Sequence, residues 1–294
     1  MKLIKQHPLV SFFVLAYAIT WSLQLAAIVL APGQGMSLSN ETNFQYFLDL
    51  LAGRLNSGQA LVYFLFTLGA GPLFAAILVT SVVEGRAGLR DLWRRSTLWR
   101  VDARWYLAAL GIPLALGVVS LGLGLLSSGG KLDYAAKLPI GSFIPFFLYM
   151  LIFTGVAEEP GWRGFALPRL QSRFNAERAS WILGLLWGVW HFPFIIYYNL
   201  AAGPAPLIAS LLGLTMGIIG WTIVNTWLYN NTESVWIMIL LHGWGNAVQS
   251  YLVLSSNNYA AQTLYGILPW AIAIFLVRKY GKENLAPRPR PTRA

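Results

Sequence analysis

Two adjacent glutamates and an arginine lie at the end of a long apolar run, in the stretch AEEPGWRGFALPRLQ at residues 157–171. Glu159 and Arg163 are four positions apart, so on a helix they lie on one face and can form an ion pair. Glu158 points about 100° away around the helix and is left without a dedicated cation. A carboxylate of this kind in an apolar environment is suited to take and give a proton near neutral pH.

Two histidines lie in other apolar segments, His191 in GLLWGVWHFPF and His242 in TESVWIMILLHGWGN. His242 and Asn246 are also four positions apart, so an imidazole and an amide lie side by side as donors for a developing oxyanion. A general base together with such donors has the residue types that amide hydrolysis needs. Each of these groups also has a bland interpretation, as a buried ion pair or a hydrogen-bonding histidine that only fixes helix packing.

The amino-acid composition indicates that transmembrane helices must position these groups. Hydrophobic residues make up 56% and charged residues 11% of the 294 positions, with a mean hydropathy of +0.57, whereas soluble proteins have about a quarter charged residues. This predicts an all-α, polytopic transmembrane helix bundle, because about 20 apolar residues cross a bilayer. Eight spans are expected, at residues 9–31, 60–83, 105–127, 140–167, 179–199, 205–228, 234–253 and 262–279.

The basic residues predict the orientation. Of the 21 lysines and arginines, only Arg54, Lys131 and Lys137 fall on the side of the predicted spans that does not carry the termini. The positive-inside rule therefore places both termini in the cytoplasm. A basic cytoplasmic face explains the net charge of +10 through anionic lipid headgroups, without nucleic acid. We expect an integral, multi-pass protein of a bacterial-type cytoplasmic membrane.

The candidate residues lie at a common depth in this arrangement. Glu158 precedes Arg169, near the cytoplasmic boundary, by 11 residues, which is about 17 Å along a helix. Counted from the nearest charged residue on the same side, His191 and His242 lie about 20 Å and 14 Å in. Ionisable groups inside a bilayer cost roughly 2.5–3.5 kcal/mol each on insertion, so their joint presence favours a functional site.

The chain is expected to form one membrane-embedded domain at residues 1–280, followed by a Pro/Arg-rich cytoplasmic tail at 281–294 that is disordered or lies on headgroups. The first apolar run is longer than the core of a cleavable signal and is interpreted as a retained signal anchor. No cysteine occurs, which excludes disulfides, thiolate metal sites and a cysteine nucleophile.

Three motifs follow one another on separate predicted spans. They are Glu-Glu-x-x-x-Arg (Glu158, Glu159, Arg163), aromatic-x-x-x-His (Trp187, His191) and His-x-x-x-Asn (His242, Asn246). This order resembles the CPBP intramembrane proteases, which include the CAAX prenyl endopeptidases and the bacterial bacteriocin-processing or Abi-like proteins. The resemblance covers about residues 140–252, the expected protease core. The family commonly has Phe where this chain has Trp187, a departure expected to affect substrate fit more than chemistry.

The resemblance implies a role for each residue. Glu158 would be the general base that activates water, His191 would help to hold that water, and His242 with Asn246 would stabilise the oxyanion. Glu159 and Arg163 would shape and anchor the site. No cofactor is certain: Glu158, His191 and His242 could bind a divalent metal such as zinc, or hold water without one. The soluble motif His-Glu-x-x-His is absent, and the metal-free glutamate mechanism is favoured.

The expected function is therefore an intramembrane endopeptidase that cuts a membrane-associated or CAAX-type peptide, or a membrane-protein tail, reaching the site from the cytoplasmic side. An aspartyl dyad and a Gly-x-Ser-x-Gly serine site have no support in the sequence. The alternatives are a proton-coupled transporter and a catalytically silent membrane scaffold. A transporter would be expected to show repeated halves or paired broken helices, and the sequence indicates neither.

Overall fold

The computed structural model describes residues 1–131 and 133–293, and this part of the chain contains helices and no strand. Six helices are long and apolar enough to cross a membrane, or up to eight spans if each of two bent helix pairs counts as one. The prediction of an all-α polytopic bundle is confirmed, and the protein is an integral multi-pass membrane protein. The α-helices are α1 (Lys2–Gln6), α2 (Pro8–Leu30), α3 (Asn40–Leu51), α4 (Ser57–Thr67), α5 (Gly71–Val83), α6 (Gly85–Ser96), α7 (Ala103–Ser127), α8 (Phe143–Met150), α9 (Ala157–Glu159), α10 (Leu167–Gln171), α11 (Ala176–Trp190), α12 (Phe192–Asn199), α13 (Pro204–Thr232), α14 (Val235–Val248), α15 (Tyr259–Ile267) and α16 (Pro269–Tyr280).

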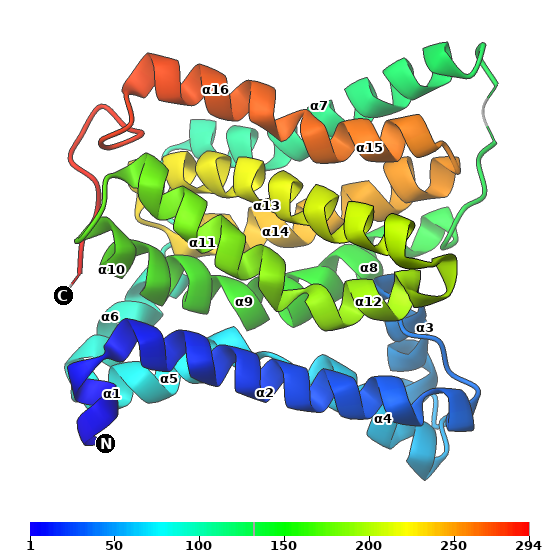
Figure 1. Ribbon diagram of the computed structural model, residues 1–294, viewed down its shortest axis with the longest axis horizontal. Coiled ribbons are helices and arrows are strands. Elements are labelled where there is room, and N and C mark those ends of the chain that lie inside the picture. Colours follow the sequence, from blue (N-terminus) through cyan, green and yellow to red (C-terminus); the bar gives the residue numbers. More distant parts are fainter. Residues whose placement is uncertain (132, 294) are drawn as a thin grey trace.

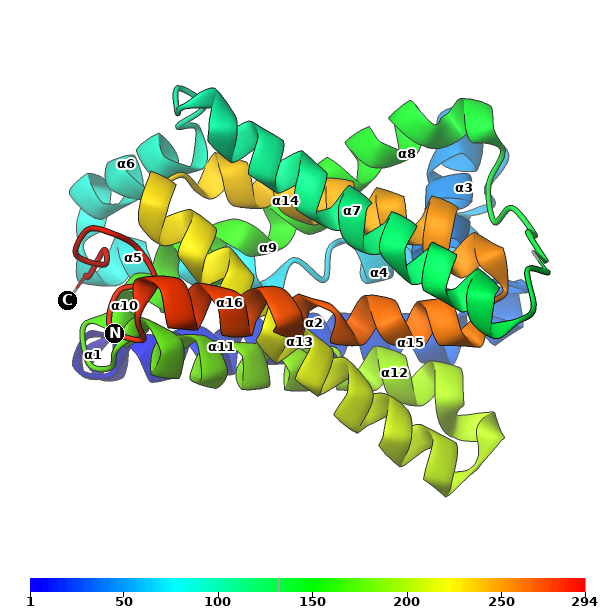
Figure 2. The same ribbon diagram turned by 90° about the horizontal axis from the view of Figure 1, so that it is seen from above.

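The axes of most long helices lie roughly along the horizontal direction of Figure 1, and the chain passes back and forth along it. Both chain termini lie at the same end of the bundle (Figure 1). We call this the terminal end; it carries α1, α6 and α10, whereas the opposite end carries α3, α12 and the start of α13 (Figures 1 and 2). α2 packs on α5, α11 on α13, and α14 and α15 both pack on α7. The helix that carries the glutamates lies between these pairs.

Two of the predicted spans are broken rather than straight. α4 and α5 meet at 58°, and α11 meets the helix that follows it at 48°. The first break coincides with Gly69, Gly71 and Pro72, and the second with Pro193, since proline removes a backbone donor and disfavours a helical residue before it. Thr20 of α2 satisfies the groups freed at the first break: its hydroxyl donates to the Gly69 carbonyl at 2.7 Å and accepts from Gly71 N–H at 3.1 Å. The sequence analysis did not foresee broken spans.

The helix that carries the glutamates continues without interruption from Ile140 to Gln171, a span of 32 residues. The expectation that it continues past Pro160 is confirmed, and it extends beyond the predicted end near Leu167. α9 is flanked by two wider, π-helical segments, η3 (Leu151–Val156) and η4 (Pro160–Ala166). π-helical turns of this kind are frequent at functional sites, and here they surround both glutamates.

Two glycines allow α14 to touch this helix. A Cβ atom on Gly155 would lie 2.7 Å from the Ile239 carbonyl oxygen, and one on Gly243 would lie 2.7 Å from the Leu151 Cα. Both obstacles are backbone atoms, which cannot rotate away as a side chain can. The backbone-to-backbone contact brings His242 of α14 next to α9.

The C-terminal tail is folded across the terminal end, and the expectation of disorder is wrong for residues 281–293. Leu285 is fully buried. The Gln171 amide donates to the Pro291 carbonyl at 3.0 Å, and the Asn230 amide donates to the Asn284 carbonyl at 2.7 Å. Two buried side-chain amides thus bind the backbone of the tail, a pairing that its composition does not reveal.

Asp91 of α6 joins the tail to the bundle. It forms ion pairs with Arg95 at 2.9 Å, Arg94 at 2.7 Å and Arg293 of the tail at 3.6 Å. Partial burial raises the pKa of Asp91, but the Arg94 hydrogen bond and the charges of Arg95 and Arg293 outweigh it, so the pKa lies below its usual value.

Gly243→Ala should destabilise the protein by about 1–3 kcal/mol, because the new methyl group must displace the Leu151 backbone. Gly245→Ala is the matched control on the same helix, since its Cβ would meet only Pro113 atoms at 3.9 Å. Thermal unfolding of the purified protein in detergent measures both. Equal midpoints for the two variants would contradict the close contact.

The stabilisation from Asp91 should be present above its unfolded pKa of about 3.9 and should be lost as pH falls through the lower folded value. Asp91→Asn should lack this dependence. Limited proteolysis of the tail between pH 7 and pH 3 measures it. A tail equally protected in wild type and variant at pH 7 would show that Asp91 does not hold it.

Candidate active site

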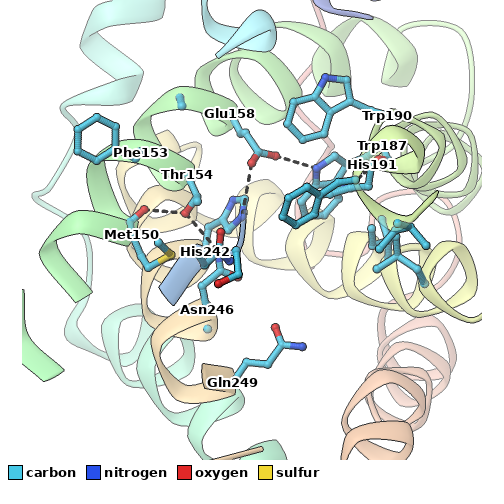
Figure 3. A pocket seen from close by; sticks show the side chains of 18 of the residues that line it. Met150, Phe153, Thr154, Glu158, Trp187, Trp190, His191, His242, Asn246 and Gln249 are labelled. Atoms are coloured by element: carbon cyan, nitrogen blue, oxygen red, sulfur yellow. Dashed lines mark hydrogen bonds and ion pairs between the residues drawn. The ribbon is translucent and has the colours of Figure 1, made fainter. Parts of the chain in front are cut away.

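One oxygen of the Glu158 carboxylate is held in place by two indole groups. Its Oε2 atom accepts hydrogen bonds from Trp187 Nε1 at 2.9 Å and from Trp162 Nε1 at 3.2 Å. The other oxygen, Oε1, lies 4.0 Å from His242 Nε2 (Figure 3). Glu158 is 6% exposed. The carboxylate therefore has one immobilised oxygen and one that is available for chemistry.

Glu159 and Arg163 form the ion pair that their spacing predicts. Arg163 Nη1 lies 2.9 Å and 3.1 Å from the two Glu159 oxygens, and the two residues are 0% and 1% exposed. The guanidinium also stacks on the Trp187 ring, 4.3 Å from its centroid. A buried arginine needs such partners.

Glu159 has a second contact that the spacing did not indicate. Its Oε1 atom lies 2.8 Å from His242 Nδ1. Because an ionised carboxylate only accepts hydrogen bonds, we assign the His242 proton to Nδ1. His242 Nε2 therefore faces Glu158 and, in the neutral ring, carries a free lone pair.

His191 lies at the break between α11 and α12, and its ring is fixed by the backbone. Its Nδ1 atom lies 2.8 Å from the Trp187 carbonyl oxygen, which only accepts, so Nδ1 carries the proton. The rings of His191 and His242 lie 5.8 Å and 5.6 Å from the Trp187 ring centroid. Trp187 therefore contacts Glu158 and both histidines.

Asn246 lies one helical turn beyond His242 and makes a defined contact. Its Nδ2 atom donates to the Thr154 hydroxyl at 3.1 Å, and Thr154 donates to the Met150 carbonyl at 2.6 Å (Figure 3). One of the two amide protons is used in this way. The other remains available for an acceptor in the cavity.

Glu158, His191, His242 and Asn246 all line one cavity of about 760 Å³. The structure thus brings together, around one cavity, the groups that three separate spans supply. The cavity extends to the opposite end, where its walls include Asn43 of α3 together with Lys137 and Tyr198; other wall residues lie in the first half of α13 and in α15.

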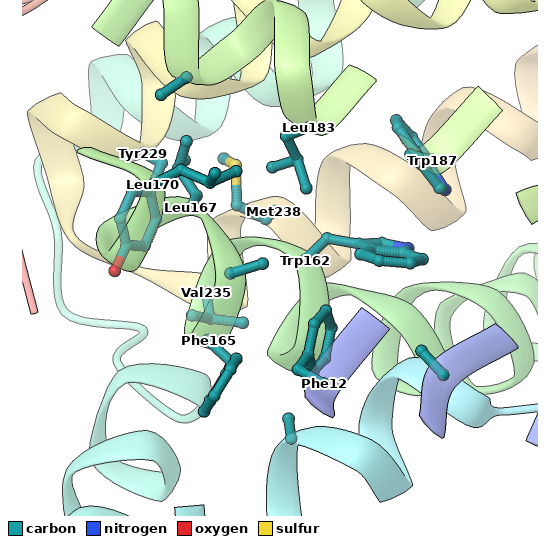
Figure 4. Packing of buried hydrophobic residues seen from close by; sticks show 14 of the residues in the cluster. Phe12, Trp162, Phe165, Leu167, Leu170, Leu183, Trp187, Tyr229, Val235 and Met238 are labelled. Carbon is teal, nitrogen blue, oxygen red and sulfur yellow. The ribbon is translucent and has the colours of Figure 1, made fainter. Parts of the chain in front are cut away.

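The terminal side of the glutamates is filled with side chains. Trp162, Phe165, Leu167 and Tyr229 are 0% to 1% exposed and pack together next to α9 (Figure 4). The sequence analysis expected a substrate to arrive from this side. The cavity leads the other way.

Glu158, His191 and His242, the residues considered above as metal ligands, line the same cavity. In residues 1–131 and 133–293, no three His, Asp or Glu side chains lie together as a group that could hold a metal ion. Glu158 Oε2 and His242 Nδ1 already have protein partners. The arrangement does not fit a three-ligand zinc site, so no step described below passes through a metal.

Trp162 and Thr154 were missed by the sequence analysis, although each lies four positions from Glu158, on the same helix face. That spacing is the signal that could have found them. Trp187 was noticed, but its departure from Phe was expected to affect substrate fit. Its indole N–H donates a hydrogen bond to the Glu158 carboxylate. The replacement of Phe by Trp at this position therefore affects the candidate catalytic group as well as substrate fit.

Comparison with known proteins agrees with this geometry. Residues 140–248 match the family described as type II CAAX prenyl endopeptidase Rce1-like. This part of the chain is therefore similar to the CPBP/CAAX family. The CAAX prenyl protease 2 of Methanococcus maripaludis is 31% identical over 146 residues, which cover 49% of this chain and 54% of that protein. The chain therefore spans about half the length of this curated relative. The matched residues of the CPBP/CAAX domain include both glutamates, Arg163, both histidines and Asn246.

Trp187→Phe should lower kcat/KM of any hydrolytic activity by roughly tenfold or more, because a hydrogen bond to a charged group contributes about 1.5–3 kcal/mol. Trp162 would still donate to Glu158. Trp181→Phe, on the outer face of the same helix, is the control and should behave as wild type. Unchanged kcat/KM in Trp187→Phe would show that the indole N–H does not support Glu158.

Proposed function

We propose that the protein is an intramembrane endopeptidase that hydrolyses a peptide bond of a membrane-associated polypeptide with water activated by Glu158. The observation that carries the proposal is the Glu158 carboxylate itself. One oxygen is held by two indole donors, and the other faces His242 Nε2 at 4.0 Å within the cavity.

The gap between Glu158 Oε1 and His242 Nε2 suits one water molecule. A separation of 4.0 Å is too long for a direct hydrogen bond, whereas two bonds of about 2.8 Å can bridge it through water. Such a water has two acceptors facing it. His191 Nε2, whose ring is held by the Trp187 carbonyl, is proposed as an alternative acceptor to His242 for the second proton of this water.

The proposed reaction proceeds in two steps. Glu158 takes a proton from the water while the water oxygen bonds to the carbonyl carbon, and the C=O electron pair moves to the oxygen. The free amide proton of Asn246 stabilises this oxyanion, while His242 Nε2 accepts a hydrogen bond from the hydroxyl that the water has become. The carbonyl then re-forms, the C–N bond breaks, and Glu158 returns its proton to the departing amine nitrogen.

Glu159 and Arg163 are proposed to hold His242 in position and to take no part in the bond changes. Because Glu159 accepts the His242 Nδ1 proton, it directs Nε2 towards Glu158 and the water between them. Arg163 pairs with the buried Glu159 carboxylate and holds it in place. Loss of either is expected to misorient His242 as well as weaken packing.

The comparisons support a protease and a polypeptide substrate in the membrane. The name of the relative refers to CAAX prenyl substrates, and a prenylated tail is one candidate substrate for this chain. We also propose that both termini are cytoplasmic, because the basic residues gather at the terminal end.

Transport is the second candidate, and one observation favours it. Two of the spans are broken, and His191 lies at one of the breaks, as is common at substrate sites of transporters. Tracer uptake into sealed proteoliposomes that requires Glu158 would favour transport, whereas cleavage in detergent favours proteolysis.

Glu158→Gln should reduce peptide cleavage by about 10²- to 10⁴-fold without loss of folding, because the amide keeps the shape but cannot accept the proton. A quenched peptide library in detergent, together with a prenylated CAAX peptide, measures this. Glu177→Gln, at the start of α11 and outside the cavity, is the matched control.

Wild-type rates in Glu158→Gln would contradict the mechanism. Adding a strong chelator to wild type tests the metal separately: unchanged cleavage is expected, and cleavage that stops and returns on adding zinc would assign a metal to the reaction.

A further inference from the structure

We propose that Gln249 is a substrate-binding residue, whose side-chain amide binds a main-chain N–H and C=O of the polypeptide one or two residues away from the scissile bond. This inference rests on the proposed endopeptidase function and deepens it, because it specifies how the substrate is held. Every amino acid except proline offers the same main-chain groups, so binding at this point accepts many sequences.

Gln249 continues the row of candidate catalytic groups on α14. His242, Asn246 and Gln249 are at positions i, i+4 and i+7, which lie within about 60° of one another around a helix. All three line the cavity that holds Glu158, and Figure 3 shows them one after another along this helix. Gln249 is also the first residue of η6 (Gln249–Val253), a π-helical segment, and such segments are frequent at functional sites.

The spacing along the helix fits an extended peptide. Gln249 lies three residues beyond Asn246, which is about 4.5 Å along the helix axis, and an extended chain advances about 3.3 Å per residue. The Asn246 amide is proposed above to hold the oxygen of the scissile carbonyl. The Gln249 amide therefore reaches the main chain one or two residues away from that carbonyl.

The Gln249 amide is free to bind a ligand. Asn246 donates to Thr154 and Ser250 donates to Glu41, but within residues 1–131 and 133–293 the Gln249 side chain forms no hydrogen bond, and it is partly exposed in the cavity. A glutamine amide supplies an oxygen acceptor and two N–H donors. These match the N–H and C=O groups that an extended polypeptide presents.

The segment that carries Gln249 is fixed to the helix that carries Glu158. Ser250, the next residue, is 3% exposed and donates to Glu41 Oε1 of α3 at 2.5 Å. α3 in turn packs on the glutamate helix through Phe44 and Tyr149, whose ring centroids lie 5.5 Å apart. Gln249 is therefore held at a defined place relative to the site.

The facing wall of the cavity also has amide atoms without partners. Asn43 lies two residues beyond Glu41 on α3 and is 1% exposed, and neither its Oδ1 nor its Nδ2 atom has a hydrogen-bond partner among the described residues. Gln24 of α2 has a buried Oε1 atom in the same condition. Both residues line the cavity. Such groups are rare in folded proteins without a reason, and a polypeptide bound between α14 and α3 supplies partners of the required kind.

Gln249→Leu should raise KM for a peptide cleaved in detergent by about 2- to 10-fold, the factor expected for one neutral hydrogen bond, with kcat unchanged. Gln249→Ala, which removes the amide without adding apolar bulk, should do the same. Gln45→Leu, the same change at an exposed residue of α3 outside the cavity, should leave both constants unchanged. Wild-type constants in both Gln249 variants, or a fall in kcat at unchanged KM, overturn the inference.

N-methylated peptides test the main-chain contact itself. Wild type and Gln249→Leu are compared on the cleaved peptide and on versions that carry one N-methyl group each, at successive positions. A methyl group one or two residues from the scissile bond should raise KM for wild type by a similar factor and should have no such effect in Gln249→Leu, where the contact is already lost. If every N-methyl group affects both proteins equally, Gln249 does not bind the main chain.

The two proposals fail in different ways. Absence of Glu158-dependent cleavage in detergent refutes the endopeptidase. Glu158-dependent cleavage with unchanged KM in both Gln249 variants keeps the endopeptidase and refutes the assignment of Gln249.

Discussion

The site depends on one buried carboxylate, Glu159. It binds Arg163 through both oxygens and accepts the Nδ1 proton of His242. A buried charge without its partner costs about 3–5 kcal/mol, so the three groups must stay together. Because His242 is on α14 and the other two on the glutamate helix, this contact also joins two spans. The glycines at 155 and 243 make the approach possible by allowing backbone contact.

The neighbouring glutamate has the opposite character. Glu158 has no arginine of its own, and its partners are indole N–H groups, which hold the carboxylate without neutralising it. The two adjacent residues therefore differ in their contacts. Both oxygens of Glu159 bind other side chains, whereas Glu158 keeps one oxygen free towards the cavity. The π-helical segments on either side of α9 also contribute to the site, because they carry Thr154 and Trp162.

The two ends of the bundle differ. Aromatic packing and the folded tail close the terminal end, while the other end keeps a cavity with unpartnered amides. His191 lies at the break before Pro193, and its ring is held by the Trp187 carbonyl one turn earlier on α11.

The sequence by itself determined the membrane-spanning, all-helical class, the approximate span limits and the Glu159–Arg163 pair, and it singled out Glu158, His191 and His242. These follow from apolar run length and helical spacing, which are local properties. Only the tertiary structure decided that Glu159 binds His242, that Trp187 binds Glu158, that the tail is folded and that the cavity leads away from the termini. Those contacts join residues far apart in the chain, and their geometry depends on close helix packing that no local pattern encodes.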